Sequence, residues 1–117
     1  MGQDLDLSYL YEITGSDSEI IIEMLELFMS ETPKQIANIK ESVGAGDWIQ
    51  IKAEAHKLKT NFIYVGLVEL NEMTIEIEKL AKEQSDMERI VQIVKKLEDG
   101  FTESLPSLDN ELKRFSG

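Results

Sequence analysis

Residues 48–66, WIQIKAEAHKLKTNFIYVG, contain the only histidine and the only tryptophan of the chain, His56 and Trp48. The apolar residues of this stretch recur every three or four positions, which is the spacing of a helix face turned toward a core. They are Trp48, Ile51, Ala55, Leu58 and Phe62. Because each helical residue advances about 100°, His56 points roughly 120° away from the middle of this apolar stripe. We predict a helix that buries one side and exposes His56 on the other.

This stretch is basic within an acidic chain. The formal net charge of the 117 residues is −11, whereas residues 48–64 carry three lysines and one acid, which are Lys52, Lys57, Lys59 and Glu54. Binding to nucleic acid or to an anionic membrane surface is disfavoured, because both depend on basic surface. The chain has no cysteine, which excludes disulfides, thiol catalysis and thiolate metal sites. No apolar run is long enough to span a bilayer and no signal peptide opens the chain, so we expect a cytoplasmic protein.

Helical patterns extend outward from this stretch in both directions. Four substantial helical arms with short connections follow a short leading helix, and one apolar stripe on each arm can meet in a common core. The predicted segments are residues 4–14, 16–43, 48–64, 67–83 and 85–115. The fold class is therefore all-α, an up-down antiparallel four-helix bundle with a short additional N-terminal helix. The length fits a single domain that spans residues 1–117.

Capping signals place the helix starts. Residues 16–19 and 85–88, SDSE and SDME, match the capping box, with the serine as the predicted cap. Asp47 is predicted to cap the histidine-bearing helix. Thr32-Pro33 fits either the start of a new helix, capped by Thr32, or a kink within a continuous one, and we favour the kinked helix. The last stripe passes through Pro106 without a change of phase, which also favours one bent helix.

Few chemistries are open to a single exposed histidine. Di-metal bundles use Glu-x-x-His pairs, but Ala53 stands three residues before His56 and no second histidine exists, so we expect no metal site. No glycine-rich phosphate loop is present, so nucleotide binding is unsupported. A neutral imidazole is a good phosphoryl acceptor near neutral pH, since the reference pKa of histidine is about 6.5. Lys59, one turn later, can screen the charge of a phosphoryl group. From these residues alone, an ordinary surface histidine remains the commoner interpretation.

A resemblance to a known family favours the phosphoryl acceptor. Residues 55–59, AHKLK, with Gly66 ten residues after His56 and Leu70 beyond it, resemble the signature of the histidine phosphotransfer (HPt) domain of bacterial phosphorelay and two-component systems. The resemblance extends over about residues 6–113. Two positions depart from the family pattern, since Thr60 and Asn61 stand where small residues are usual. Thr60 either narrows the approach of a partner or offers its hydroxyl to the phosphoryl oxygens.

The resemblance implies a function in signal transduction. His56 would accept a phosphoryl group from a receiver-domain aspartyl phosphate and pass it to another receiver aspartate. The implied partners are response-regulator receiver domains, of a hybrid sensor histidine kinase and of a downstream regulator. The chain would act as a monomeric phosphoprotein with no cofactor of its own, because the receiver would supply Mg²⁺, and we expect no independent kinase activity. Gly66 is expected to act as a structural residue at the start of the next helix.

Helix phase predicts the surface on which a receiver would dock. It consists of the residues that surround His56 on the exposed side, which are Ile49, Lys52, Ala53, Lys59, Thr60 and Ile63. We expect the short leading helix to flank this surface. Simple solvent exposure is the alternative for each residue, and Ile49 and Ile63 could also lie at the edge of the core.

A non-catalytic helical adaptor is the alternative function. Four acids of the segment 67–83 fall on its predicted wet side and could form an acidic protein-interaction face, although a solvated helix flank is the commoner explanation. They are Glu69, Glu72, Glu76 and Glu78. The two functions differ in whether modification of His56 changes partner binding.

Overall fold

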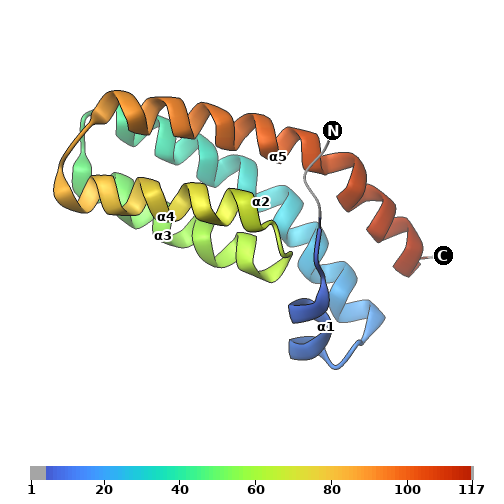
Figure 1. Ribbon diagram of the computed structural model, residues 1–117. Helices are drawn as coiled ribbons and strands as arrows, with labels where there is room; N and C mark the ends of the chain where they lie inside the picture. The colour runs from blue at the N-terminus through green and yellow to red at the C-terminus, as the bar shows by residue number, and fades with distance from the viewer. Residues whose placement is uncertain (1–4, 117) are drawn as a thin grey trace.

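The computed structural model describes residues 5–116, and these residues form five helices and no strand. The helices are α1 (Ser8–Thr14), α2 (Ser18–Gly44), α3 (Trp48–Tyr64), α4 (Val68–Glu83) and α5 (Met87–Ser116). Consecutive long helices run in opposite directions, and α1 lies across one end of the bundle (Figure 1). The predicted all-α bundle with a short leading helix is confirmed.

The four long helices form a closed ring of neighbours. Helix α2 packs on α3, α3 on α4, α4 on α5, and α5 returns to α2. The apolar stripe of each helix faces the centre of this ring, where Phe28 makes edge-on contacts with Phe62 and Phe101 at ring-centroid distances of 5.9 Å and 5.7 Å. Such edge-to-face pairs stabilise the core beyond the area that they bury. Along residues 5–116, no helix combines the length and apolar character that a bilayer span requires.

Both prolines lie inside continuous helices. Pro33 falls within α2 and Pro106 within α5, so the prediction of one continuous helix at each position is confirmed. Both prolines are exposed, and water can therefore bond the carbonyl that each proline leaves without its helical partner. Thr32 does not cap a helix, because it is fully buried in the middle of α2.

The two predicted serine caps are wrong by one residue. Asp17 caps α2, since its carboxylate accepts from the backbone N–H groups of Glu19 and Ile20. Asp86 precedes α5 and accepts from the N–H of Arg89 at 3.1 Å. In each turn an aspartate follows the serine. Its carboxylate places a full negative charge at the positive end of the helix, which favours the aspartate over the serine as the cap.

Helix α3 matches its predicted phase, with one correction at its start. Asp47 is the cap, as predicted, and accepts from the N–H of Gln50 at 3.1 Å. Ile51, Ala55, Leu58 and Phe62 are fully buried. Trp48 is only partly buried, because the first residue of α3 lies at the end of the bundle, where no further turn of helix covers it.

Candidate functional site

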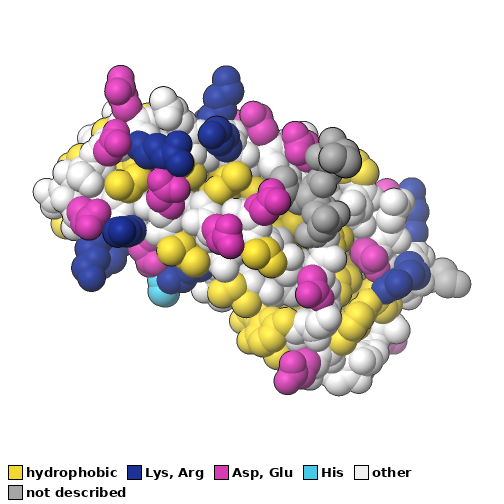
Figure 2. Space-filling model, in the orientation of Figure 1, with side chains coloured by type: hydrophobic (Ala, Val, Ile, Leu, Met, Phe, Trp, Pro, Cys, Tyr) yellow, Lys and Arg dark blue, Asp and Glu magenta, His cyan; other side chains and the backbone are white. Residues whose placement is uncertain are grey.

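His56 stands on the outer surface of α3, beside α4. Its side chain is 65% exposed, and Figure 2 shows it at the edge of the molecule with a basic side chain beside it. The buried stripe of α3 fixes the rotation of the helix, and this rotation in turn fixes the direction of the histidine. The prediction that His56 is exposed is confirmed.

The second ring nitrogen of His56 is held by Glu78 of α4. The distance from His56 Nδ1 to Glu78 Oε2 is 2.9 Å. An ionised carboxylate can only accept hydrogen bonds, so Nδ1 must carry the proton that is shared in this contact. In the neutral ring, Nε2 then bears a free lone pair. The contact therefore selects the tautomer in which the outer nitrogen is a nucleophile.

Lys59 completes a three-residue cluster through the other oxygen of the same carboxylate. Lys59 Nζ donates to Glu78 Oε1 at 2.8 Å, and the Glu78 side chain is only 20% exposed. The hydrogen bond from Lys59 is the main reason why the pKa of the Glu78 carboxyl lies below its ordinary value. The contact with His56 lowers this pKa further, and burial opposes both effects. Glu78 is thus ionised at neutral pH, as the tautomer assignment requires.

The sequence pattern missed the role of Glu78, which was assigned only to the wet side of its helix. A signal was nevertheless present. Helices α3 and α4 are antiparallel around the turn at Gly66, so residues at similar distances before and after the turn face each other. His56 lies ten positions before Gly66 and Glu78 twelve positions after it. The choice among the acids of α4 required the helix rotation that only packing sets.

The predicted docking residues share one exposed strip of α3 with His56. Ile49 is 79% exposed and Ile63 is 43% exposed, so neither belongs to the core. Lys52, Ala53 and Thr60 are exposed as well. Lys59 is the exception, because its side chain is 26% exposed and lies against Glu78. The exposure of Ile49 favours a surface position over the edge of the core, whereas Ile63 is about half covered.

Helix α4 adds apolar residues that the sequence analysis did not include. Val68 and Ile75 are 59% and 46% exposed. They lie seven residues apart on the same side of α4, and Ile75 is one turn before Glu78. The exposed apolar surface around His56 therefore comes from two helices, with Ile49 and Ile63 on α3 and Val68 and Ile75 on α4.

Helix α1 lies at the end of α3 that follows His56. The ring of Tyr9 stacks on the ring of Tyr64 at a centroid distance of 6.0 Å. Tyr9 and Ile13 are each 44% exposed, and hydrophobic side chains gather at this end of the molecule in Figure 2. The expected position of the leading helix, beside the surface that carries His56, is consistent with this stacking.

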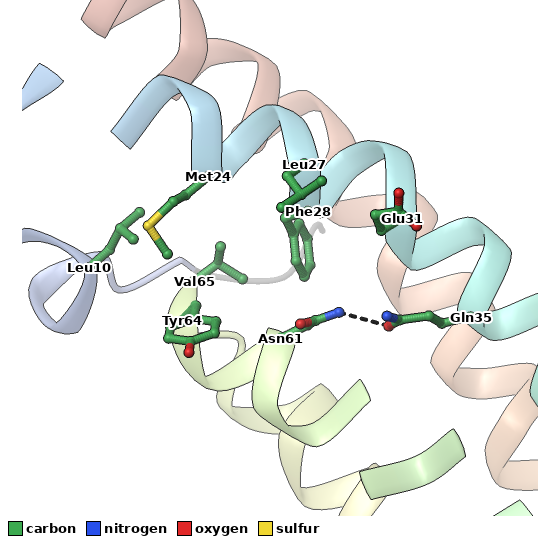
Figure 3. A pocket seen from close by; sticks show the side chains of 9 residues that line it. All are labelled: Leu10, Met24, Leu27, Phe28, Glu31, Gln35, Asn61, Tyr64 and Val65. Atoms are coloured by element: carbon green, nitrogen blue, oxygen red, sulfur yellow. Dashed lines mark hydrogen bonds between the residues drawn. The ribbon is translucent and has the colours of Figure 1, made fainter. Parts of the chain in front are cut away.

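The two positions that depart from the family pattern have different environments. Thr60 is exposed, and its hydroxyl donates to the backbone oxygen of His56 over a long distance of 3.4 Å. Asn61 turns inward and donates to Gln35 of α2 at 2.7 Å. This bond forms one wall of a pocket of about 210 Å³ between α1, α2 and α3 (Figure 3). Asn61 thus joins two helices, whereas Thr60 stays beside the histidine.

Gly66 lies in the turn between α3 and α4. Its backbone φ is +65°, and a Cβ at this position would overlap the backbone carbonyl of Asp6. The segment before α1 therefore passes directly over the turn between α3 and α4. Only glycine offers both the left-handed conformation and the space for this close approach.

The geometry supports nucleophilic chemistry by one residue. A solvent-facing imidazole nitrogen with a fixed tautomer, a carboxylate behind it and an ammonium one turn away can accept a group that carries negative charge. Within residues 5–116, no group of three or more histidine, cysteine or acidic residues could hold a metal ion.

The fold has close counterparts among solved structures. Histidine-containing phosphotransfer protein B (HptB) from Pseudomonas aeruginosa PAO1 matches with a TM-score of 0.85 at 20% identity, over 94% of this chain and 95% of that one. The HPT domain of the Hpt sensor hybrid histidine kinase from Shewanella matches with a TM-score of 0.79 at 22% identity, over 97% of both chains. At these identities the likeness concerns the fold.

Comparison of the sequence identifies the family. No curated protein sequence matches the chain significantly. The sequence model of the Hpt domain matches residues 23–115, which include α3 and α4 and both residues of the His56–Glu78 contact. Since this match covers most of the chain, the protein belongs to the Hpt domain family.

Proposed function

We propose that His56 accepts a phosphoryl group from the aspartyl phosphate of a receiver domain and passes it to the aspartate of another receiver. Membership of the Hpt family supports a histidine phosphotransfer role in a phosphorelay. The observation that carries the assignment to His56 is its contact with Glu78, which in the neutral ring places the lone pair on Nε2 of an exposed side chain.

The proposed transfer begins when Nε2 of His56 attacks the phosphorus atom. A bond forms between nitrogen and phosphorus, and the bond from phosphorus to the aspartyl oxygen breaks, so that the aspartate leaves with the electron pair. The imidazole ring then carries a positive charge, which the Glu78 carboxylate stabilises through Nδ1–H. In the second transfer, an aspartate of the acceptor attacks the phosphorus atom, and Nε2 regains its lone pair.

Lys59 has a separate role in this proposal. Its ammonium group contacts Glu78 in the unmodified protein and lies one turn from His56. A phosphoryl group on Nε2 offers a second acceptor with up to two negative charges, and Lys59 would stabilise it by charge-assisted hydrogen bonding. The receiver would supply Mg²⁺, which neutralises charge on the transferring group.

Receiver domains are the partners in this proposal. One of the two solved counterparts is a domain of a sensor hybrid histidine kinase, which supports a receiver of such a kinase as the donor. The exposed apolar residues of α3 and α4 around His56 provide a surface of the kind that marks protein-interaction sites. The charged Lys52 at its edge would favour approach of an acidic receiver surface.

The adaptor alternative has less support. Of the four acids on which it rests, Glu78 is bonded to His56 and Lys59, and Glu76 pairs with Arg89 of α5 at 3.0 Å. Only Glu69 and Glu72 remain exposed without such a pairing among the described residues. Two of the four carboxylates are therefore already paired with basic groups or with the histidine, which weakens the case for a free acidic face on α4.

The test is phosphoryl transfer from a radiolabelled receiver domain. We expect the wild-type protein to acquire label that is labile in acid and stable in base, as phosphohistidine is. The variant His56→Gln should acquire none, while Glu72→Gln, which alters an exposed residue of α4, should be labelled like the wild type. Label retained by a folded His56→Gln protein would refute the assignment.

A further inference from the structure

A second polar site lies on the side of α3 that faces away from His56. Glu54 and His56 are two residues apart, so they project about 200° apart around the helix. Glu54 faces the groove between α2 and α3 and is only 4% exposed. It is the one charged residue of the buried set along residues 5–116. Burying a carboxylate costs free energy, which hydrogen bonds or nearby charges must offset.

The hydrogen bonding of Glu54 is incomplete. Oε1 accepts from the side-chain amide of Gln50 at 2.9 Å, and Lys57 Nζ lies 3.5 Å from the same oxygen. Oε2 is buried and accepts no hydrogen bond from the described residues. The last torsion of a glutamate side chain is broad, so a small rotation can bring Oε2 to the wall of the groove. A carboxylate with one unused oxygen is a strong acceptor for a cationic donor.

The groove beside Glu54 is polar and open to solvent. It forms a pocket of about 390 Å³ between the end of α2, the connecting turn and the first turns of α3. Acidic and amide side chains provide most of its acceptors, and these are Asn38, Glu41, Asp47, Gln50 and Glu54. The carboxylates of Glu41 and Asp47 thus line the same pocket as Glu54, and the Asp47 carboxylate also caps α3.

The end of α2 adds negative potential to this pocket. The carbonyl end of a helix carries a partial negative charge, and basic residues commonly offset it. The last turn of α2 has no basic residue. The nearby Lys40 is directed to α5 instead, where it pairs with Glu98 at 3.1 Å. The positive N-terminal end of α3 lies at the same pocket, but no basic side chain lines it, so its side-chain charges are all negative.

We propose that this pocket binds the guanidinium group of an arginine side chain from a partner protein. A metal ion fits poorly, because no group of three acidic residues within residues 5–116 is close enough to hold one. A guanidinium group instead spreads five N–H donors over a planar fork, which suits acceptors that lie on two helices and a turn. The overall charge of −11 also favours a basic partner.

The proposal concerns a contact that is independent of His56. A partner bound through this pocket would leave the surface around His56 free, since the two lie on opposite sides of α3. The proposed arginine site can therefore be refuted without affecting the proposed phosphotransfer function, and the reverse also holds.

Binding can be tested with the full chain and a small probe. We would titrate ¹⁵N-labelled protein with N-acetyl-arginine amide and follow the side-chain amide of Gln50 and the backbone amide of Asp47 by NMR. The matched control probe is N-acetyl-citrulline amide, which has the same shape without the charge. We expect saturable shifts at these two residues with the arginine probe only.

Variants of the site sharpen the test. Glu54→Gln keeps the size of the side chain and should weaken binding at least about tenfold. Lys57→Gln removes the competing ammonium and should strengthen binding. Glu103→Gln removes the same charge from an exposed position of α5 and should leave binding unchanged. The proposal is overturned by unsaturable shifts, by equal binding of the citrulline probe, or by unchanged binding to a folded Glu54→Gln protein.

Discussion

Glu78 Oε2 of α4 lies 2.9 Å from Nδ1 of His56 on α3, while the other oxygen of the same carboxylate accepts from Lys59 at 2.8 Å. One carboxylate therefore orients the nucleophile and the nearest cation together. Neither the tautomer of the ring nor the position of the ammonium is set by α3 alone. The reactive geometry depends on how α4 packs against α3.

Glu78→Ala should slow phosphoryl transfer to His56 by about 10-fold to 100-fold, which is the range typical of partners that orient metal-binding histidines. The ring would lose its tautomer preference and the stabilisation of its positive charge. Nitrogen NMR shifts of the imidazole should reveal a mixture of tautomers in the variant and mainly the Nδ1–H form in the wild type. Glu72→Ala is the matched control on the same helix, and a tautomer ratio equal to that of the wild type in Glu78→Ala would contradict the role of Glu78.

Lys59→Ala should reduce transfer or shorten the lifetime of the phosphohistidine by about tenfold, since one charge-assisted hydrogen bond is lost. The bundle should remain folded, because the lysine is partly exposed and does not belong to the buried hydrophobic core. Single-turnover transfer and phosphohistidine decay measure the two effects. Lys96→Ala, which changes an exposed residue of α5, should behave like the wild type. If Lys59→Ala showed the same kinetics as the wild type and the Lys96→Ala control, Lys59 would be only a surface charge.

Phe62→Ala should lower the free energy of unfolding by about 3–5 kcal/mol, because a fully buried ring that contacts Phe28 is removed. Trp48→Ala should cost less, since Trp48 is only partly buried at the end of the bundle. Urea unfolding of both variants provides the comparison. A larger loss of unfolding free energy in Trp48→Ala than in Phe62→Ala would show that Trp48, and not Phe62, lies at the centre of the core.

Gly66→Ala should destabilise the protein more than Gly15→Ala. Both glycines have a φ of +65°, so alanine at either position costs about 1–2 kcal/mol for the left-handed backbone. Only at Gly66 would the added Cβ also overlap the backbone of Asp6, whereas no atom lies within 4 Å at Gly15. Thermal unfolding of the pair isolates the cost of this overlap. Equal losses would mean that the segment before α1 moves away freely.

The pH dependence of stability should change in Glu78→Gln. The pKa of Glu78 is lower in the folded state than its ordinary value of 4.5, so the folded state binds the proton less tightly than the unfolded state. The ionised carboxylate therefore stabilises the fold above about pH 4.5, and this contribution is lost as the pH falls through the folded-state pKa. The decline in unfolding free energy on acidification should be shallower in Glu78→Gln. An unchanged slope would argue against the pairing with Lys59 in solution.

The local sequence pattern was sufficient to predict much of the fold of this protein. The spacing of Ile51, Ala55, Leu58 and Phe62 predicted both the buried face of α3 and the exposure of His56, because helix geometry fixes relative direction along one element. The resemblance to the HPt family singled out Gly66 as well, and its left-handed backbone conformation favours glycine. The cap of α3 at Asp47 depended on its immediate neighbours only.

Only the tertiary structure decided the remainder. The choice of Glu78 as the partner of His56 depends on the rotation of α4 against α3, and the packing of four stripes into one core sets this rotation. The burial of Glu54 likewise arises because α2 covers one flank of α3. The sequence by itself thus determined the apolar stripe that each helix buries, whereas packing determined which polar side chains are covered and which side chains from different helices meet.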